Sequence, residues 1–260
     1  MKASEIMEQL FTFGAWADFR NSCDTLKAGD PDRQVTKVAV TMTAKADVLK
    51  QALSWGAEMM IVHEPTYFNH WDEHSDDKVE CMKRAIIEES GLVIYRFHDH
   101  PHYAMPDMIS AGMMEQMALD ADISFEPYNL TRAILRQPMT AVEFAKLLED
   151  SLNIKHLRIC GARDIPSTHI SARFGASGGL IEEMQKEDTQ ILLCGETTEW
   201  SVAEYARDAA ALGLHKTLII MGHVGSERYG MIYIAKQLMK MLPQLDVRYF
   251  DCGEVYTYTD

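Results

Sequence analysis

The sequence predicts an α/β fold, in which short buried strands alternate with amphipathic helices. Two apolar runs, residues 37–43 and 58–62, flank a segment, residues 44–57, whose apolar side chains recur at helical spacing. This order is a βαβ unit, and its strands should run parallel because the helix carries the chain back to the end at which it started. The same alternation returns later in the chain, so the prediction covers most of its length.

The other expected elements follow in chain order. Residues 1–20 have the pattern of an amphipathic helix, and the acids among their apolar residues argue against a signal peptide. A second helix over residues 76–90 should end at Gly91 and bury Val79, Met82, Ile86 and Ile87 on one face. Thr140 and Glu143 form a capping box for a helix over 140–152. The remaining expected strands are 92–97, 169–174, 190–195, 216–222 and 246–250, and the remaining helices are 180–184, 199–212 and 225–242.

Composition narrows the function. The chain has 260 residues and a formal net charge of −14, and it contains no basic patch, so we expect no nucleic-acid partner. No apolar run approaches the length that spans a bilayer, so we expect no membrane insertion. The five cysteines are odd in number and widely spread without a CxxC motif, which favours a reducing, cytoplasmic setting over a disulfide framework.

Histidines follow three of the predicted strands. His63 comes directly after the strand at 58–62, His98 after the strand at 92–97 and His223 after the strand at 216–222. The carboxyl ends of strands in open α/β sheets are where ligand sites lie, because the loops there converge on one crevice. A single histidine in such a place is more often structural, but three in equivalent places favour a ligand-binding site.

Carboxylates and further histidines accompany these three positions. Glu64 follows His63, Glu227 lies one helical turn after His223, and the loop after His98 adds Asp99, His100 and His102. Ligation by imidazole and carboxylate without sulfur suits Zn, Fe or Mn. About six such ligands are too many for one tetrahedral ion, and they fit two divalent ions about 3.5–4 Å apart with a bridging water.

These motifs resemble those of the NIF-three-like family, whose members are often labelled type 2 GTP cyclohydrolase I. The stretches IVHEPTYF, RFHDHPH and GHVGSE are similar to its three histidine motifs, in the same order. GASGGLIEEM resembles its glycine-rich turn, CGETTEWSVAEYARDAAALG its TGE segment and, more weakly, CDTLKAGD its N-terminal WDNxGL. The similarity extends over most of the chain.

The resemblance implies two intertwined α/β halves with mixed sheets and a homohexamer. Residues 1–130 with 215–260 would form the half that carries the metal site, and residues 131–214 the second half. It also implies a dinuclear metal site. The ligands carried over by position are His63, Glu64, His98, His102, His223 and Glu227.

Two of these positions depart from the family pattern. Glu64 replaces the second histidine of the HHP motif, and His102 replaces the expected aspartate. The exchange conserves the number of ligands, so both stay candidates, and Asp99, His100 and Asp107 compete for the second position.

The leading functional hypothesis is a hydrolase with an unknown small-molecule substrate. A hydroxide bridging the metals would attack carbon or phosphorus, with Glu196 as a candidate acid–base residue or as a plain surface residue. One alternative is a non-enzymatic protein that binds metal or a partner. Another is an amidohydrolase or metallo-β-lactamase suggested by His98-x-His100, but HxHxDH would need an aspartate and a histidine after Pro101, where this chain has His102 and Tyr103.

Overall fold

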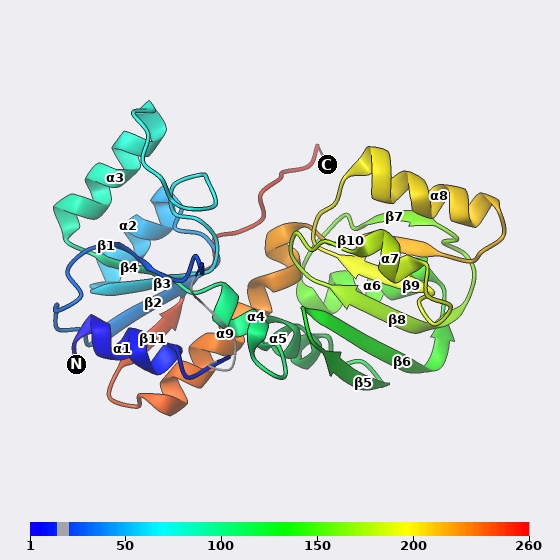
Figure 1. The fold of residues 1–260 in the computed structure, drawn as a ribbon, viewed down its shortest axis with the longest axis horizontal. Helices are drawn as coiled ribbons and strands as arrows, with labels where there is room; N and C mark the ends of the chain where they lie inside the picture. Colours follow the sequence, from blue (N-terminus) through cyan, green and yellow to red (C-terminus); the bar gives the residue numbers. More distant parts are fainter. Residues whose placement is uncertain (15–20, 260) are drawn as a thin grey trace. The chain divides into compact units, whose positions relative to one another are not determined.

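The computed structural model describes residues 1–14 and 21–259 and divides the chain into two compact units (Figure 1). The first unit contains Met1–Ala104 and Gly230–Gly253, and the second contains Met105–Tyr229 and Glu254–Asp260. Each unit holds one sheet, so the predicted α/β class with mixed sheets is confirmed. The domain boundaries near residues 130 and 214 stay a prediction.

The first unit is built on a five-stranded sheet with the order β1-β4-β3-β2-β11. Four of its strands are parallel, and β1 pairs antiparallel with β4 at the edge. All side chains of β3 and β4 are buried, which is expected of parallel strands covered on both faces. The strands are β1 Leu26–Ala28, β2 Lys37–Thr41, β3 Met59–Val62, β4 Val93–Arg96 and β11 Asp246–Tyr249.

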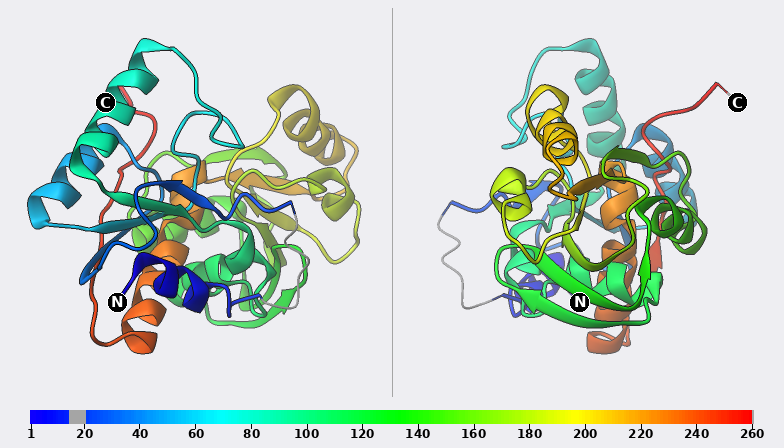
Figure 2. Two further views of the ribbon diagram at one scale, coloured as in Figure 1. Left: turned by 60° about the vertical axis from the view of Figure 1, so that its left-hand side comes forward. Right: turned by 90° about the vertical axis from the view of Figure 1, so that its right-hand side faces the viewer.

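Helices cover both faces of this sheet. In Figures 1 and 2, α2 and α3 lie on one face and α1 on the other. The helices of this unit are α1 Ala3–Leu10, α2 Ala46–Trp55, α3 Lys78–Ser90 and the short α4 Asp99–Tyr103. The amphipathic helix expected over residues 1–20 ends at Leu10, and part of the expected range, residues 15–20, lies outside the described residues.

The predicted buried face of α3 was wrong in part. Ile87 is buried as expected, but Val79 and Met82 are 62% and 63% exposed, and Glu80 and Lys83 are buried in their place. Glu80 accepts hydrogen bonds from the backbone N–H and the hydroxyl of Ser75, and the Lys83 ammonium donates to a backbone carbonyl at Thr66. The inner face of α3 therefore holds the loop over residues 66–75 through polar contacts, which an apolar periodicity cannot reveal.

The second unit contains a six-stranded mixed sheet with the order β5-β6-β8-β9-β10-β7. Its centre, β8-β9-β10, is parallel, while β5, β6 and β7 join it antiparallel. The β5–β6 hairpin and β7 were not predicted from the sequence. The strands are β5 Ala121–Glu126, β6 Leu130–Met139, β7 Arg158–Gly161, β8 Ser167–Arg173, β9 Ile191–Cys194 and β10 Thr217–Ile220.

The core of the second unit follows the alternation of side chains along β9 and β10. Leu192, Cys194, Leu218 and Ile220 pack in one cluster with residues of α7 and α8. Because alternate side chains of a strand point to opposite faces, Leu193 and Ile219 face the other side. The helices are α5 Met108–Met117, α6 Ala141–Leu152, α7 Leu180–Met184, a π-helix Glu199–Ala203 continuing into α8 Glu204–Ala211, and α9 His223–Met241. Residues of α9 up to Tyr229 belong to this unit, and those from Gly230 to the first.

Within residues 1–14 and 21–259, no helix combines the length and the apolar character needed to cross a membrane.

We predict that Lys83→Ala and Ile87→Ala both destabilise the protein, by about 1–3 kcal/mol for the lost charged hydrogen bond and about 2–4 kcal/mol for the cavity. Glu89→Ala on the exposed face of α3 is the matched control and should change stability by less than about 0.5 kcal/mol. Urea unfolding followed by circular dichroism measures all three. If Lys83→Ala is as neutral as the control, α3 does not hold the loop through this side chain.

Candidate metal centre

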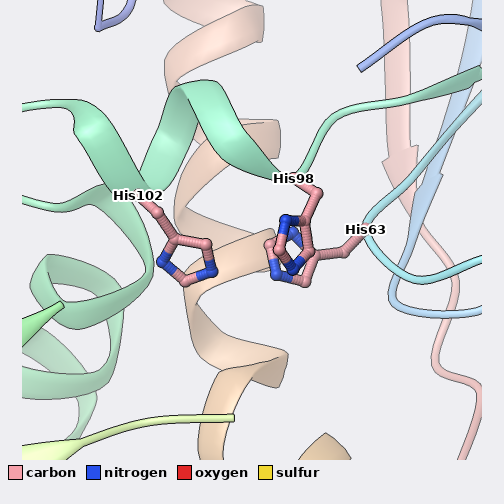
Figure 3. A group of neighbouring side chains, drawn as sticks. All are labelled: His63, His98 and His102. Carbon is pink, nitrogen blue, oxygen red and sulfur yellow. The ribbon is translucent and has the colours of Figure 1, made fainter. Parts of the chain in front are cut away.

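Three histidines of the first unit point toward one another (Figure 3). His63, His98 and His102 each offer a ring nitrogen, and these nitrogens all lie within 4.8 Å of one another. The ring centroid of His63 lies 4.6 Å from that of His98 and 5.1 Å from that of His102. His63 is fully buried, and the other two are half-buried. Three imidazoles that converge in this way form a donor set suited to one divalent transition-metal ion.

Strand register and one short helix produce this convergence. β3 and β4 are neighbouring parallel strands in which Val62 pairs with Arg96, so the loops that carry His63 and His98 leave the same edge of the sheet. His98 precedes α4 and His102 lies within it, four residues later. Residues four apart share a helix face, so α4 presents both imidazoles in one direction.

Hydrogen bonds fix the tautomers of two of these rings. Nδ1 of His63 lies 3.1 Å from the carbonyl oxygen of Phe97, which can only accept, so Nδ1 carries the proton. Nδ1 of His98 lies 2.8 Å from the Asp99 carboxylate. Both imidazoles therefore present the lone pair of Nε2, as a metal-binding histidine must.

The Asp99 carboxylate is held in its ionised form. Burial raises its pKa, but hydrogen bonds from His98, from the Ser22 hydroxyl and from the Cys23 backbone outweigh burial, and its pKa lies well below the ordinary value. Cys23 also lies near His98 and Asp99. Burial raises the pKa of its thiol to about 12, so the thiol is protonated at neutral pH. Asp99 is thus placed to orient His98.

A buried carboxylate, Asp24, fixes the start of α4. It accepts hydrogen bonds from the backbone N–H groups of residues 98, 99 and 100 at 2.6, 2.9 and 2.8 Å. It also lies 2.6 Å from Nδ1 of His100, which is itself buried. Sequence reasoning missed this residue, although the stretch CDTLKAGD that resembles the family's WDNxGL contains it.

The structure gives two of the competing candidates other partners. His100 faces Asp24, as described, and its ring stacks on Phe97 at 6.1 Å. The Asp107 side chain accepts a hydrogen bond from the backbone N–H of Ser110 at 2.8 Å and so caps α5. His100 and Asp107 therefore make structural contacts, the first with Asp24 and the second at the start of α5.

Glu64 lies beside a buried arginine. Its Oε2 is 4.0 Å from Nη2 of Arg96, which is 1% exposed. Nε of Arg96 donates to the backbone carbonyl of His63 at 3.0 Å, and its guanidinium also approaches Asp72. Arg96 therefore braces the loop that carries both His63 and Glu64.

A second group of candidate ligands belongs to the second unit. His223 opens α9, so Glu227 follows it by four residues in regular helix, and Nε2 of His223 lies 3.1 Å from Oε2 of Glu227. On the other side of the ring, Nδ1 lies 3.0 Å from Oε1 of Glu196. Two carboxylates beside an imidazole favour a positive charge between them, supplied by a second proton or by a metal ion at Nε2. The chemistry of this donor set therefore fits a divalent cation.

The glycine-rich turn makes room for Glu227. A Cβ atom on Gly175 would meet the Glu227 carboxylate, and the φ of Gly175 is +67°, which side chains rarely adopt. The backbone N–H of Gly175 donates to the Ser226 hydroxyl at 2.9 Å, which joins the turn to the first turn of α9. The turn over residues 175–179 thus positions a candidate ligand.

The fold and these two groups define an α/β protein with histidine and carboxylate clusters able to hold metal ions. The sequence matches the model of the DUF34/NIF3 family (NGG1p interacting factor 3) over residues 1–253, and the chain belongs to this family. Curated relatives include a GTP cyclohydrolase 1 type 2 homolog of Campylobacter jejuni, 28% identical over 94% of both chains. Another of the same name, from Clostridium perfringens, is 22% identical over 84% of this chain and 83% of the relative.

Solved structures show the same fold. Staphylococcus aureus protein SA1388 has a TM-score of 0.78 at 18% identity and covers 99% of both chains. A Bacillus cereus protein related to NIF3 has a TM-score of 0.78 at 14% identity and covers 100% of this chain and 99% of its own. The resemblance found in the motifs is thereby confirmed.

The environment of Asp24 predicts loss of stability in acid. Burial raises the pKa of its carboxyl, but the hydrogen bonds from His100 and from the backbone of residues 98–100 outweigh burial and lower it below the ordinary value. A lowered folded-state pKa stabilises the fold above about pH 4 and loses this contribution as the pH falls toward the folded-state value. Urea unfolding between pH 7 and pH 3 should show a smaller acid loss for Asp24→Asn than for the wild type.

At pH 7, Asp24→Asn should itself cost about 1.5–3 kcal/mol, the range for hydrogen bonds to a charged group. Asp164→Asn, whose side chain is 81% exposed, serves as the control and should follow the wild type throughout. Equal acid losses in the wild type and in Asp24→Asn would show that Asp24 is not ionised in the way that the hydrogen bonds indicate.

Proposed function

We propose that this protein is a metal-dependent hydrolase that binds two divalent ions per chain, Zn, Fe or Mn. The proposal rests first on the converging imidazoles of His63, His98 and His102, which would hold one ion, with Glu64 as the additional ligand taken from the sequence. His223 and Glu227 would hold the other. The names of the curated relatives, GTP cyclohydrolase 1 type 2 homolog, support a hydrolytic reaction.

Divalent ions, when bound, supply a water-derived nucleophile near neutral pH and positive charge for a developing oxyanion. The protein's own residues would prepare their binding. The Phe97 carbonyl and Asp99 hold the protons on Nδ1 of His63 and His98, which leaves Nε2 of each ring for a ligand. Glu196 does the same at Nδ1 of His223 and is more exposed than that ring, so it is our candidate for proton exchange with solvent.

Metal content is the direct test. The purified protein should contain two equivalents of divalent metal by mass spectrometry, and His63→Ala or His98→Ala should lose about one of them while keeping the fold, because loops at strand ends tolerate change. His74→Ala is the matched control, since its side chain is 53% exposed and lies in a loop of the same unit. Full metal content in either variant would remove that residue from the ligand set.

Turnover then decides between an enzyme and a binding protein. The metal-loaded protein should hydrolyse at least one substrate in a panel of cyclic amidines and phosphoesters, and chelation should abolish the activity. Two equivalents of metal without turnover on either class would favour the non-enzymatic, metal-binding alternative.

The two departures from the family pattern should be coupled. We predict that Glu64→His and His102→Asp each weaken one metal site, and that the double variant recovers part of the loss, because residues that share a site deviate from additivity by about 0.5–3 kcal/mol. Glu64→Gln keeps the shape and removes only the charge, so it tests whether the charge of Glu64, which also faces Arg96, contributes to metal binding. Metal titration measures all four variants, and losses that simply add would exclude compensation.

We also propose a homohexamer in the cytoplasm. The family resemblance suggests the assembly. Four exposed apolar side chains of the first unit could form a subunit contact: Phe68, Trp71, Val79 and Met82. Light scattering should give six times the chain mass of 29.5 kDa. The double variant Val79→Lys and Met82→Lys should lower that mass, whereas Glu89→Lys on the same helix should not. An unchanged mass in the double variant would place the contact elsewhere.

A further inference from the structure

A cavity of about 290 Å³ opens beside His223 within the second unit. We propose that this cavity binds the planar aromatic or heteroaromatic ring of a small-molecule ligand, and that His156, Tyr256 and Tyr258 form its ring-binding wall. As the binding site of the substrate, it rests on the hydrolase proposed above. The binding of a ring can be measured without that reaction.

Two separate segments bring aromatic side chains to the cavity. His156 lies between α6 and β7, and Tyr256 and Tyr258 lie in the segment after Gly253. The rings of His156 and Tyr258 pack with centroids 4.2 Å apart and an interplanar angle of 42°. Rings held in this way offer flat surfaces on which a further ring can stack, with a gain of about 0.5–1.5 kcal/mol per contact beyond burial.

The segment that carries the tyrosines is anchored at one end by charge. Oε1 of Glu254 lies 3.3 Å from Nη2 of Arg228, which is 8% exposed in its side chain. The other carboxylate oxygen lies over the first turn of α9, where a Cβ atom on Gly222 or Gly225 would be 3.9 or 3.8 Å away. An anion at a helix N-terminus is stabilised by the exposed N–H groups there. Glu254 therefore fixes the start of the wall next to His223.

The large side chains that follow Glu254 in the sequence are exposed to solvent. Val255, Tyr256 and Tyr258 are 68%, 67% and 49% exposed, although they border a cavity floored by the buried side chains of Ile220 and Met221. Neighbouring large apolar side chains that stay open to solvent beside buried side chains are typical of a binding surface. A ring inserted here would cover both the wall and the floor.

The volume of the cavity and the polar side chains that line it restrict the class of ligand further. A cavity of about 290 Å³ is at the lower limit for small-molecule sites, which suits one ring or a fused pair. Outside the aromatic wall, its charged and titratable groups lie at Arg158, Glu196, His223 and Glu254. A ligand whose ring lies against the tyrosines would therefore direct its polar substituents to His223 and to the Arg158 guanidinium.

The tyrosines of the wall lie outside the residues that the family model matches. The family model covers residues 1–253, and Val255, Tyr256 and Tyr258 come after it. The ligand motifs of the family thus set the chemistry, and the following segment of this chain would set which ring is accepted.

Purine is a suitable probe because it is a soluble, planar, fused heteroaromatic ring. Saturation-transfer NMR and titration of the full chain should detect binding of purine, but not of cyclohexanol, which is similar in size to one ring and not planar. Tyr258→Ala should weaken purine binding at least fivefold, and Tyr258→Phe should retain it, because the ring and not the hydroxyl makes the contact. Tyr128→Ala removes another exposed tyrosine of the same unit and should bind like the wild type.

The outcomes separate this inference from the hydrolase proposal. Purine binding should persist after removal of metal by chelation, so a failure of metal binding or turnover leaves it standing. Equal binding by Tyr258→Ala and the wild type, binding of cyclohexanol as strong as that of purine, or no saturation transfer at all would overturn it. Stronger binding after truncation at Gly253 would also overturn it, since the segment would then cover the cavity instead of forming its wall.

Discussion

The histidine cluster of the first unit depends on one buried carboxylate. Asp24 is 4% exposed and accepts hydrogen bonds from the backbone N–H groups of three consecutive residues, 98–100, which connect β4 to α4. A charge buried without such partners would cost several kcal/mol. With them, the backbone of His98 is fixed, and the i, i+4 geometry of α4 then fixes His102. A residue outside the cluster thereby determines the direction of two of its three imidazoles.

In both units, a neighbouring group contacts Nδ1 of the candidate histidine and so orients the ring, but the group differs between the units. In the first, a carbonyl and a carboxylate hold the Nδ1 protons of His63 and His98. In the second, Glu196 faces Nδ1 of His223. Because Gly175 has no side chain, the Glu227 carboxylate can pack against the backbone of Gly175. Orienting each imidazole from its far nitrogen fixes the tautomer and raises the basicity of the nitrogen that remains. The glycine is therefore as much a part of the arrangement as the carboxylate that it accommodates.

The sequence predicted correctly those elements whose apolar pattern is caused by burial. Strands β3 and β4 are apolar because both their faces are covered, so the positions of His63 and His98 after them followed directly. It failed where polar contacts replace apolar ones. The inner face of α3 carries Glu80 and Lys83, and burial lowers the pKa of Lys83 to about 8. Asp24 was missed because a single acid in a loop carries no period, and only its hydrogen bonds reveal its role.

The exchange of ligand types has a consequence for charge. The cluster of His63, His98 and His102 is neutral when its imidazoles are ready to bind, so a divalent ion held there alone keeps its full charge. The nearby negative charge of Asp99 acts through the Nδ1 proton of His98, and the charge of Glu64 is shared with Arg96. A weakly neutralised ion is a stronger Lewis acid than one bound by carboxylates, because less negative charge offsets it. Replacing the family's aspartate by His102 would thus leave more positive charge at this site for polarising a bound substrate.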